Sequence, residues 1–523
     1  MRLSGSLLPL IGAVLLAVPA GASVTPPKPS VAKPRDRSEA VRAVAAAALE
    51  RAQANDCRGA LAKLDPLLPD LPPGRDRDMV QLLRLPCLGP AGRPAEVPQV
   101  QAELAKAQPN NGMVRAFGIF VAVNQNRFDD AGEQLAVLAE QDPDALRMVP
   151  GALWRAIAQK LTEDDKFALR DHAYIALARA DWQPSDQPDL RDALAQGAIQ
   201  ALLEQKQVEE ARELLPRVTV PELLAGMAME RVYQPIWPDI EARLGPNGGK
   251  AVDRFAAVRL ARLADSPNDP HALRDAVRSF LLLGRYQDAI EQSAPARIVP
   301  GMDEDAVAVI RYRAQALAAL GKRDEAIALL MHFTTLDLVK NPEAVDGVVG
   351  LAEMLDEAGR EVEALKVADD ALGKGREALS GYGAMWLART RACALGALGR
   401  SAEAAKQGDA LKAGAGDNEA AAVEGLLCLG RRDEAAAIAI RALSTVEGAS
   451  GIADQFQPEG AFWAPSESRL RAMWGPLLAR ADVKAAFDKA ARILPQSLWP
   501  AKAPREIPHV APPADDADSV STT

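Results

Sequence analysis

The sequence predicts an all-α fold, an α-solenoid of tandem helix-turn-helix repeats followed by a C-terminal helical cap. The first observation is a phrase that occurs three times, as LGRYQDAI at 283–290, LGKRDEAI at 320–327 and AGREVEAL at 358–365. The second is composition, because 48% of the residues are hydrophobic, only 4% are aromatic, and strand-like alternation is scarce. The third is the length of 523 residues, which exceeds what one packed core usually supports. A solenoid avoids that limit, since each repeat packs only on its neighbours.

Residues 1–22 have the pattern of a signal peptide. An apolar core at 7–18 follows Arg2, and Ala20-Gly21-Ala22 supplies the small residues before a cleavage site, so we expect cleavage between Ala22 and Ser23. The core is shorter than the ~20 residues that a membrane-spanning helix needs. We therefore expect an exported protein, periplasmic or secreted, without an integral membrane segment after cleavage.

Residues 23–37 carry four prolines and four basic residues without apolar periodicity, which predicts an extended Pro-rich linker. The folded part is expected to begin at Ser38.

The solenoid is predicted to span residues 38–445. In each phrase a Gly suits the left-handed end of one helix, and an acidic residue suits the first turn of the next. With the Ala of the phrase as an index, small residues recur twelve positions earlier and large apolar residues nine positions earlier. This register gives eleven candidate units, of which eight are clear; the indices of the weaker copies are Ala168, Ala211 and Ala251.

The second half of each unit resembles the tetratricopeptide repeat. Ala131, Leu135 and Pro143 stand at the spacing of that family, together with the Gly-basic-x-acidic-Ala turn. The first half departs from the family, because its Trp is missing and Ala314 and Leu317 replace its Gly and Tyr. The resemblance implies an exported bacterial tetratricopeptide-like protein whose stacked helix pairs form a concave binding face.

Residues 446–499 differ from the repeats in being rich in aromatic side chains. A loop is expected at 447–460, and helices are expected at 466–479 and 482–494. This segment is interpreted as a cap that shields the last helix pair from water, with an aromatic contact surface as the alternative. Residues 500–523 are rich in Pro and Asp and are expected to form a disordered tail.

No catalytic, cofactor-binding or metal-binding residues are predicted. The four histidines, His172, His271, His332 and His509, lack the spacing of a zinc-binding helix, and no nucleotide-binding loop or nucleophile elbow occurs. Glu467-Ser468 matches two residues of exported lytic transglycosylases, and the match extends no further. A net charge of −10 without a basic stripe argues against nucleic acid as a partner.

The sequence therefore predicts a non-enzymatic scaffold of the bacterial cell envelope without a cofactor. Its partner would be a protein or peptide, bound as an extended or helical segment on the concave solenoid face. The sequence does not identify the binding residues. The alternatives are a structural subunit of an envelope assembly, and a peptidoglycan- or glycan-processing enzyme or its accessory.

Cys57 and Cys87 are predicted to form a disulfide. On the repeat register they lie on consecutive antiparallel helices, at the start of one and near the end of the other, and an exported chain permits oxidation. The alternative is two buried thiols. Cys393 and Cys428 lie on the first helices of successive units, one turn out of step, and free thiols are expected there.

Overall fold

The computed structural model describes residues 34–463 and 468–508. The expected signal peptide, the cleavage site between Ala22 and Ser23 and most of the linker 23–37 lie outside them. The described residues are helical apart from turns, connecting segments and one isolated antiparallel bridge between Glu230 and Ala491. The chain divides into two compact units, Met1–Gln205 and Lys206–Thr523.

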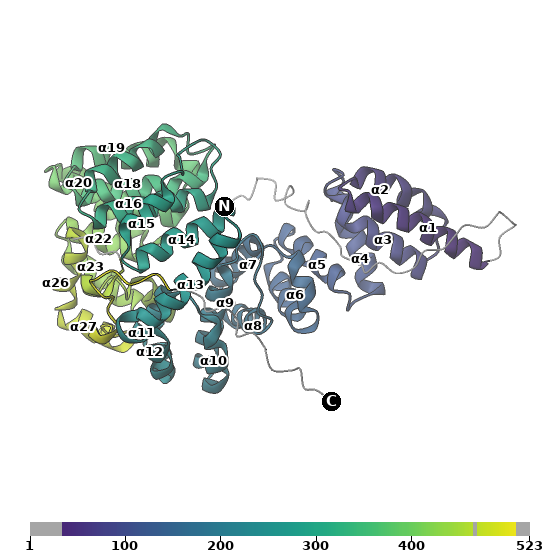
Figure 1. The fold of residues 1–523 in the computed structure, drawn as a ribbon, viewed down its shortest axis with the longest axis horizontal. Coiled ribbons are helices and arrows are strands. Elements are labelled where there is room, and N and C mark those ends of the chain that lie inside the picture. The colour runs from purple at the N-terminus through teal and green to yellow at the C-terminus, as the bar shows by residue number, and fades with distance from the viewer. Residues whose placement is uncertain (1–33, 464–467, 509–523) are drawn as a thin grey trace, which may run out of the picture. The chain divides into compact units, whose positions relative to one another are not determined.

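Unit 1 consists of helix hairpins in tandem (Figure 1). Its helices are α1 (Pro34–Gln53), α2 (Cys57–Leu64), α3 (Arg75–Leu88), α4 (Val97–Ala107), α5 (Gly112–Asn124), α6 (Phe128–Gln141), α7 (Gly151–Glu163), α8 (Phe167–Arg179) and α9 (Leu190–Glu204). The first helix begins at Pro34, four residues before the expected start of the fold at Ser38.

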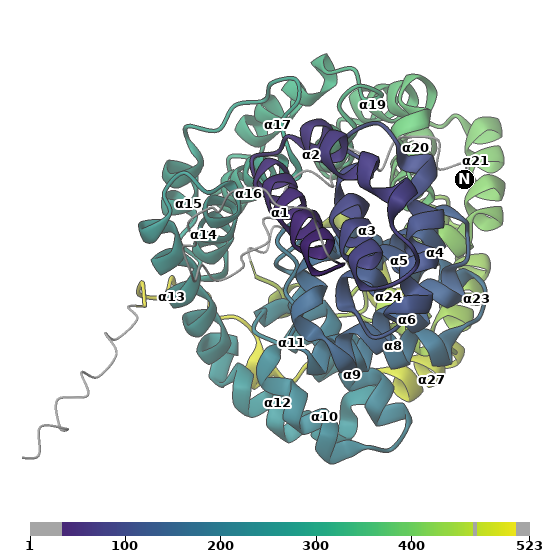
Figure 2. The same cartoon turned by 90° about the vertical axis from the view of Figure 1, so that its right-hand side faces the viewer.

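Unit 2 continues the pattern and ends in short helices. Its helices are α10 (Val208–Leu214), α11 (Pro221–Met229), α12 (Trp237–Leu244), α13 (Gly249–Asp265), α14 (Pro270–Leu282), α15 (Tyr286–Ser293), α16 (Glu304–Ala319), α17 (Arg323–Met331), α18 (Val345–Glu357), α19 (Glu361–Lys374), α20 (Gly381–Ala397), α21 (Ser401–Ala413), α22 (Glu419–Cys428), α23 (Arg432–Ala442), α24 (Val446–Ile452), α25 (Arg469–Ala472), α26 (Trp474–Leu478) and α27 (Ala481–Ala490). Figure 2 shows the second helices α15, α17, α19, α21 and α23 along the outer edge of this unit.

The turn inside each regular hairpin has one geometry. In the described residues, a positive φ occurs five positions before the index at Asn55, Gly92, Asn126, Lys206, Gly284, Gly321, Gly359, Gly399 and Gly430, and three positions before the index Ala168 at Asp165. The next backbone N–H closes the turn, as where Arg285 N–H donates to the Phe280 carbonyl at 2.8 Å. Asn and Asp adopt this left-handed conformation more readily than other residues with a side chain, so the same turn recurs upstream without glycine.

The basic and acidic residues of the repeated phrase pair with each other across this turn. Arg400 lies 2.7 Å from Glu403, and Arg431 lies 2.6 Å from Glu434. These partly exposed pairs are three residues apart and belong to the turn. The charge pattern of the phrase is thus explained by pairing within the turn.

The index alanines lie where the two helices of a hairpin meet. Ala60, Ala131, Ala326 and Ala435 are fully buried. The index expected at Ala168 was wrong, because Ala168 is exposed. The buried residue at the equivalent place in α8 is Arg170.

The middle of the chain is irregular, as its prolines indicate. Pro235 and Pro246 lie in 3₁₀ turns on either side of the eight-residue α12, and Ala251 falls in the first turn of α13. A proline lacks a donor N–H, so it shortens the helices next to it.

The C-terminal segment differs from the expected cap and tail. Residues 447–460 are not a plain loop, because α24 starts at Val446, and the expected helix at 466–479 is the two short helices α25 and α26. Residues 500–508 are also ordered, since Arg505 N–H donates to the Leu283 carbonyl at 2.9 Å. We call residues 446–463 and 468–508 the strap.

Candidate functional site

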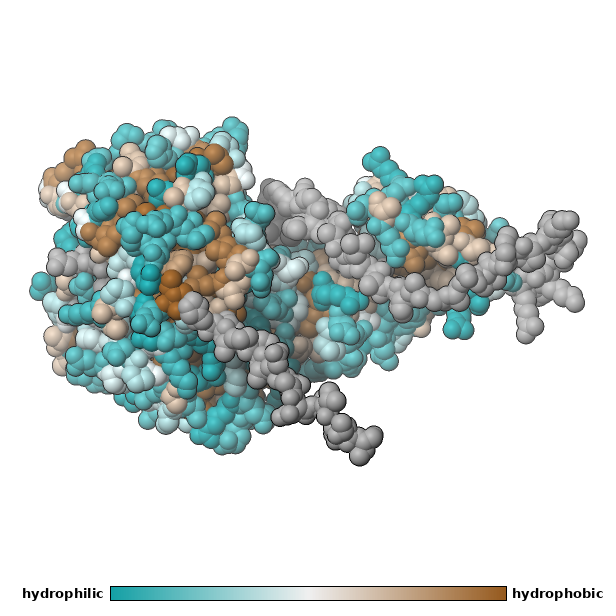
Figure 3. All heavy atoms as spheres, viewed as in Figure 1, coloured by the Kyte–Doolittle hydropathy of each residue, from teal (hydrophilic) through white to brown (hydrophobic). Residues whose placement is uncertain are grey.

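The first helices of unit 1 line a cavity of about 370 Å³. α1, α3, α5 and α7 all contribute, whereas of the second helices only α2 and α4 reach it, with the residues at their starts. Its large apolar side chains are Leu49, Met113, Phe117, Phe120, Met148 and Leu153. Figure 3 shows apolar surface over α1 and α3 on the face of unit 1 turned to the viewer. The cavity therefore lies on the face where a partner-binding groove was expected.

Among the residues that the structure describes, no charged residue and no histidine lines this cavity, although a quarter of the chain is charged. The polar side chains in its lining are four uncharged amides, and its remaining wall includes five prolines. The amides are Gln53, Asn55, Asn124 and Gln125, and the prolines are Pro86, Pro90, Pro94, Pro98 and Pro150. The site is thus suited to apolar contact rather than to acid–base chemistry.

Cys57 and Cys87 form part of the cavity wall and are joined by a disulfide, with their Cα atoms 4.9 Å apart. Cys57 begins α2, and Cys87 lies in the last turn of α3 and is buried. The bond ties the first two hairpins together beside the cavity, at the pair of cysteines that the repeat register singled out.

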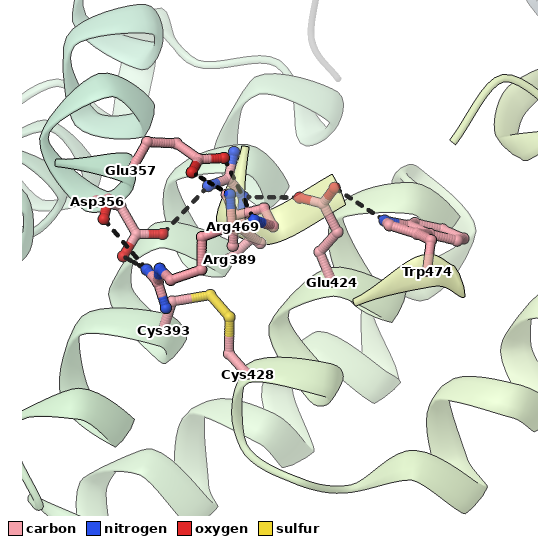
Figure 4. The surroundings of a disulfide bond; sticks show 9 residues. Asp356, Glu357, Arg389, Cys393, Glu424, Cys428, Arg469 and Trp474 are labelled. Atoms are coloured by element: carbon pink, nitrogen blue, oxygen red, sulfur yellow. Dashed lines mark hydrogen bonds and ion pairs between the residues drawn. A yellow bond between two sulfur atoms is a disulfide. The ribbon is translucent and has the colours of Figure 1, made fainter. Parts of the chain in front are cut away.

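Cys393 and Cys428 also form a disulfide, with Cα atoms 5.0 Å apart, so the expectation of free thiols was wrong (Figure 4). The repeat register counts positions along the chain, and it does not fix how far the parallel helices α20 and α22 are shifted along each other. In the structure that shift brings the ends of the two helices together.

A buried ionic cluster surrounds this second disulfide. The Arg389 side chain is fully buried, and its guanidinium lies 3.5 Å from Asp356 and 3.4 Å from Glu424. These are ion pairs without hydrogen-bond geometry, because Nε, Nη1 and Nη2 of Arg389 have no hydrogen-bond partner among the described residues. Burial raises the pKa of Asp356 to about 6, against the opposing effect of Arg389.

The strap docks on this cluster, as Figure 4 shows. Arg469 donates to Asp356 at 2.9 Å, and the Glu357 carboxylate accepts from the Arg469 N–H at 2.8 Å and from the Ser468 hydroxyl. Trp474 is buried and donates its indole N–H to Glu424 at 3.0 Å. The strap therefore supplies both a cation and a donor to carboxylates of α18 and α22.

The strap then runs back to the start of unit 2. Arg492 lies 2.6 Å from Glu241 and stacks on the Trp237 ring, and Arg505 lies 2.8 Å from Asp253. Between these anchors, Phe456, Trp474 and Phe487 pack together, with ring centroids 4.9 Å and 5.2 Å apart. The segment is thus more than a terminal cap, because it joins the last hairpins to α11–α14.

The histidines form no catalytic arrangement among the described residues. His172 pairs with Glu140 at 2.9 Å on the surface, and His271 pairs with Asp305 at 2.7 Å between α14 and α16. His332 lies in the turn after α17, and His509 lies outside the described part.

The structure describes only one residue of the Glu467-Ser468 pair. Glu467 of the Glu467-Ser468 pair is not described, and Ser468 belongs to the strap contact. In the described ranges, no cluster of three or more His, Cys, Asp or Glu residues could hold a metal ion. No helix there combines the length and apolar character needed to cross a membrane.

Comparisons with known proteins give a weak structural likeness. No family model matches the chain, and no curated protein matches its sequence. The crystal structure of yeast Tom70 is 15% identical with a TM-score of 0.32, over 80% of this chain and 95% of that one. A circular tandem repeat protein with novel repeat topology and enhanced subunit contact surfaces is 14% identical with a TM-score of 0.11, over 86% and 90%.

These scores are too low to support an argument about this chain. The fold assignment therefore rests on its own helices, which form an α-solenoid of tetratricopeptide-like helix pairs.

Proposed function

We propose that the protein is a non-enzymatic interaction module of the bacterial cell envelope, and that the first-helix face of unit 1 binds a segment of a partner protein. The observation that carries this proposal is the uncharged apolar cavity built by α1, α3, α5 and α7. Binding sites in proteins are commonly apolar pockets that carry a few polar side chains.

Unit 2 supports the proposal because a segment of the chain covers first helices there. There the first helices α18, α20 and α22 supply Glu357, Arg389 and Glu424, and the strap covers them. The chain thus contains one example of a segment bound along first helices. The first helices of unit 1 hold the apolar cavity instead.

Export is the second part of the proposal. All four cysteines of the chain are paired in two disulfides, and such bonds persist in oxidising compartments such as the periplasm. The signal-peptide pattern of residues 1–22 agrees with this location. N-terminal sequencing of the mature protein should give Ser23, and a mature form that begins at Met1 would contradict export.

The test of binding is affinity capture from an envelope extract with two variants of α1. Ala52→Phe adds a ring at a half-buried cavity position, and Ala43→Phe makes the same change at an exposed position outside the cavity. A specific partner should be captured by the native chain and by Ala43→Phe, and lost with Ala52→Phe. Equal capture by both variants would reject the site, and turnover of peptidoglycan by the purified chain would reject the non-enzymatic assignment.

A further inference from the structure

We infer that the occupant of the unit 1 cavity is a partner helix that presents an uncharged apolar face. This inference rests on the proposed function and narrows it, because an extended or a helical segment was expected from the sequence. Three observations support a helical occupant: the uncharged lining of the cavity, the small number of side chains that could bond to a peptide backbone, and the manner in which unit 2 binds the strap.

The absence of charge selects the side chains of the occupant. A cavity without ionised groups offers no counter-charge, so a buried Lys, Arg, Asp or Glu of the partner would lose hydration without gaining an ion pair. The contact face of the partner must therefore be apolar. Its charged residues, if it has any, must point to solvent.

The scarcity of hydrogen-bonding groups in the cavity favours one backbone conformation of the bound segment. An extended segment carries one N–H and one C=O at each residue, and these need partners when they are buried. The cavity offers the amides Gln53 and Asn55 at the end of α1, and Asn124 and Gln125 at the end of α5. Its five prolines have no N–H to donate. A helix needs no such partners along its length, because its backbone bonds are internal.

The strap shows that these repeats bind helices through large apolar side chains. Trp474 and Leu477 on α26 and Phe487 on α27 are buried in the packing against the last hairpins. Outside its helices the strap uses backbone bonds to the rest of unit 2, as where Arg492 N–H donates to the Met229 carbonyl at 2.8 Å. The strap is nevertheless a poor match for unit 1. It is anchored through arginines on carboxylates, and none of the described residues that line the unit 1 cavity has a carboxylate.

The cavity wall is also preorganised, which favours binding by a preformed helix. The Cys57–Cys87 disulfide fixes α2 against α3, and the prolines restrict the backbone beside it. A wall that is ordered before binding loses little conformational entropy on binding. Reduction of this disulfide should therefore weaken binding without abolishing the helical fold.

The test uses a labelled neutral peptide of about five helical turns, ~18 residues, with Leu at i, i+3, i+4 and i+7 and Gln elsewhere. A second peptide of the same composition alternates Leu and Gln and so favours a strand. Fluorescence anisotropy with the mature chain should show binding of the helical peptide at least about tenfold tighter than of the alternating one, a difference of ~1.4 kcal/mol. Ala52→Phe should remove this binding, Ala43→Phe should leave it intact, and salt should change it less than about twofold.

Two outcomes would overturn the inference that the occupant is a helix. One is equal affinity for both peptides, and the other is a neutral monoacyl lipid that binds at the Ala52 position while neither peptide does. If envelope capture depends on Ala52 but the captured partner binds through an extended segment, the proposed function stands and this inference fails. If no partner is captured and neither peptide binds, both fail.

Discussion

Arg389 is the residue whose removal should most clearly reveal the energetics of unit 2. Its side chain is fully buried on α20 between Asp356 and Glu424, both of which are buried themselves. Arg389→Met keeps the volume of the side chain approximately but leaves Glu424 without its buried cation and Asp356 with Arg469 alone. Breaking a buried ion pair in this way costs about 3–5 kcal/mol. The separations of 3.4–3.5 Å exceed those of strong charge-assisted hydrogen bonds, so we expect the lower end, about 3 kcal/mol.

Hydrogen exchange measures this effect locally, which suits a chain of two units that need not unfold in one step. Amides of α18, α20 and α25 should open roughly a hundredfold more often in Arg389→Met, as ~3 kcal/mol implies. The matched control is Arg391→Met in the same helix. Arg391 pairs with the half-exposed Asp369 at 2.6 Å, so its loss should cost less than about 1 kcal/mol.

The pH dependence of this variant has a definite sign. Burial already raises the pKa values of Asp356 and Glu424, against the effect of Arg389. Without Arg389 both carboxyls should titrate still higher, so the destabilisation should be largest above neutral pH and smaller at pH ~5, where protonation removes the unpaired charge. An effect no larger than that of Arg391→Met, or one that grows on acidification, would refute the reasoning.

Four further predictions concern Glu230, Glu357, the Cys57–Cys87 disulfide and the strap. Burial raises the pKa of Glu230 to about 7, so the free energy of unfolding falls as the pH rises from about 4.5 to about 7. Glu230→Gln should therefore raise the Tm at pH 8 and leave it nearly unchanged at pH 4. Glu357→Gln should increase hydrogen exchange at the start of α25, because the carboxylate accepts the Arg469 N–H there. Cys57→Ser with Cys87→Ser should destabilise unit 1 by roughly 3 kcal/mol in urea unfolding, since the bond closes a separation of 30 residues. Truncation before Val446 should release α18–α23 to rapid exchange, and unchanged protection there would contradict the role given to the strap.

The repeat could be predicted from the sequence because its signals are local. The Gly of the phrase marks the left-handed turn, and the index Ala marks the crossing of two helices, so hairpins with both were placed correctly. The register fails in the hairpin whose turn residue is Asp165, because Arg170 and not Ala168 holds the buried position there. The turn needs a residue that tolerates positive φ, and that requirement is wider than glycine.

The sequence also contains a local signal for the unit 1 cavity. Pro86, Pro90, Pro94 and Pro98 recur every four residues, across the end of α3 and the start of α4. Prolines at these places end or begin helices, which predicts a rigid apolar corner. The other walls could not be predicted, because they combine side chains from α1, α5 and α7 that meet only after the hairpins stack.

The buried cluster was beyond local reasoning for a different physical reason. Arg389 and Glu424 look like ordinary charged residues of amphipathic helices, and their burial depends on the strap, whose Trp474 lies 50 residues after Glu424. The pairing of Cys393 with Cys428 likewise depends on the axial shift between α20 and α22. A repeat register contains no information about either arrangement.

The strap changes how the stability of unit 2 should be understood. In an open solenoid each repeat contacts only its neighbours, so stability is a sum of local terms and loss of one end leaves the rest folded. Here Arg469 contacts α18, while Arg492 and Arg505 reach Glu241 and Asp253 more than 200 residues earlier in the chain. Burial of Phe456, Trp474 and Phe487 contributes about 1.5–3 kcal/mol for each ring, and the sum approaches the stability of a whole domain. The last hairpins therefore depend on contacts that close the unit on itself, and unit 2 should unfold as one body rather than repeat by repeat.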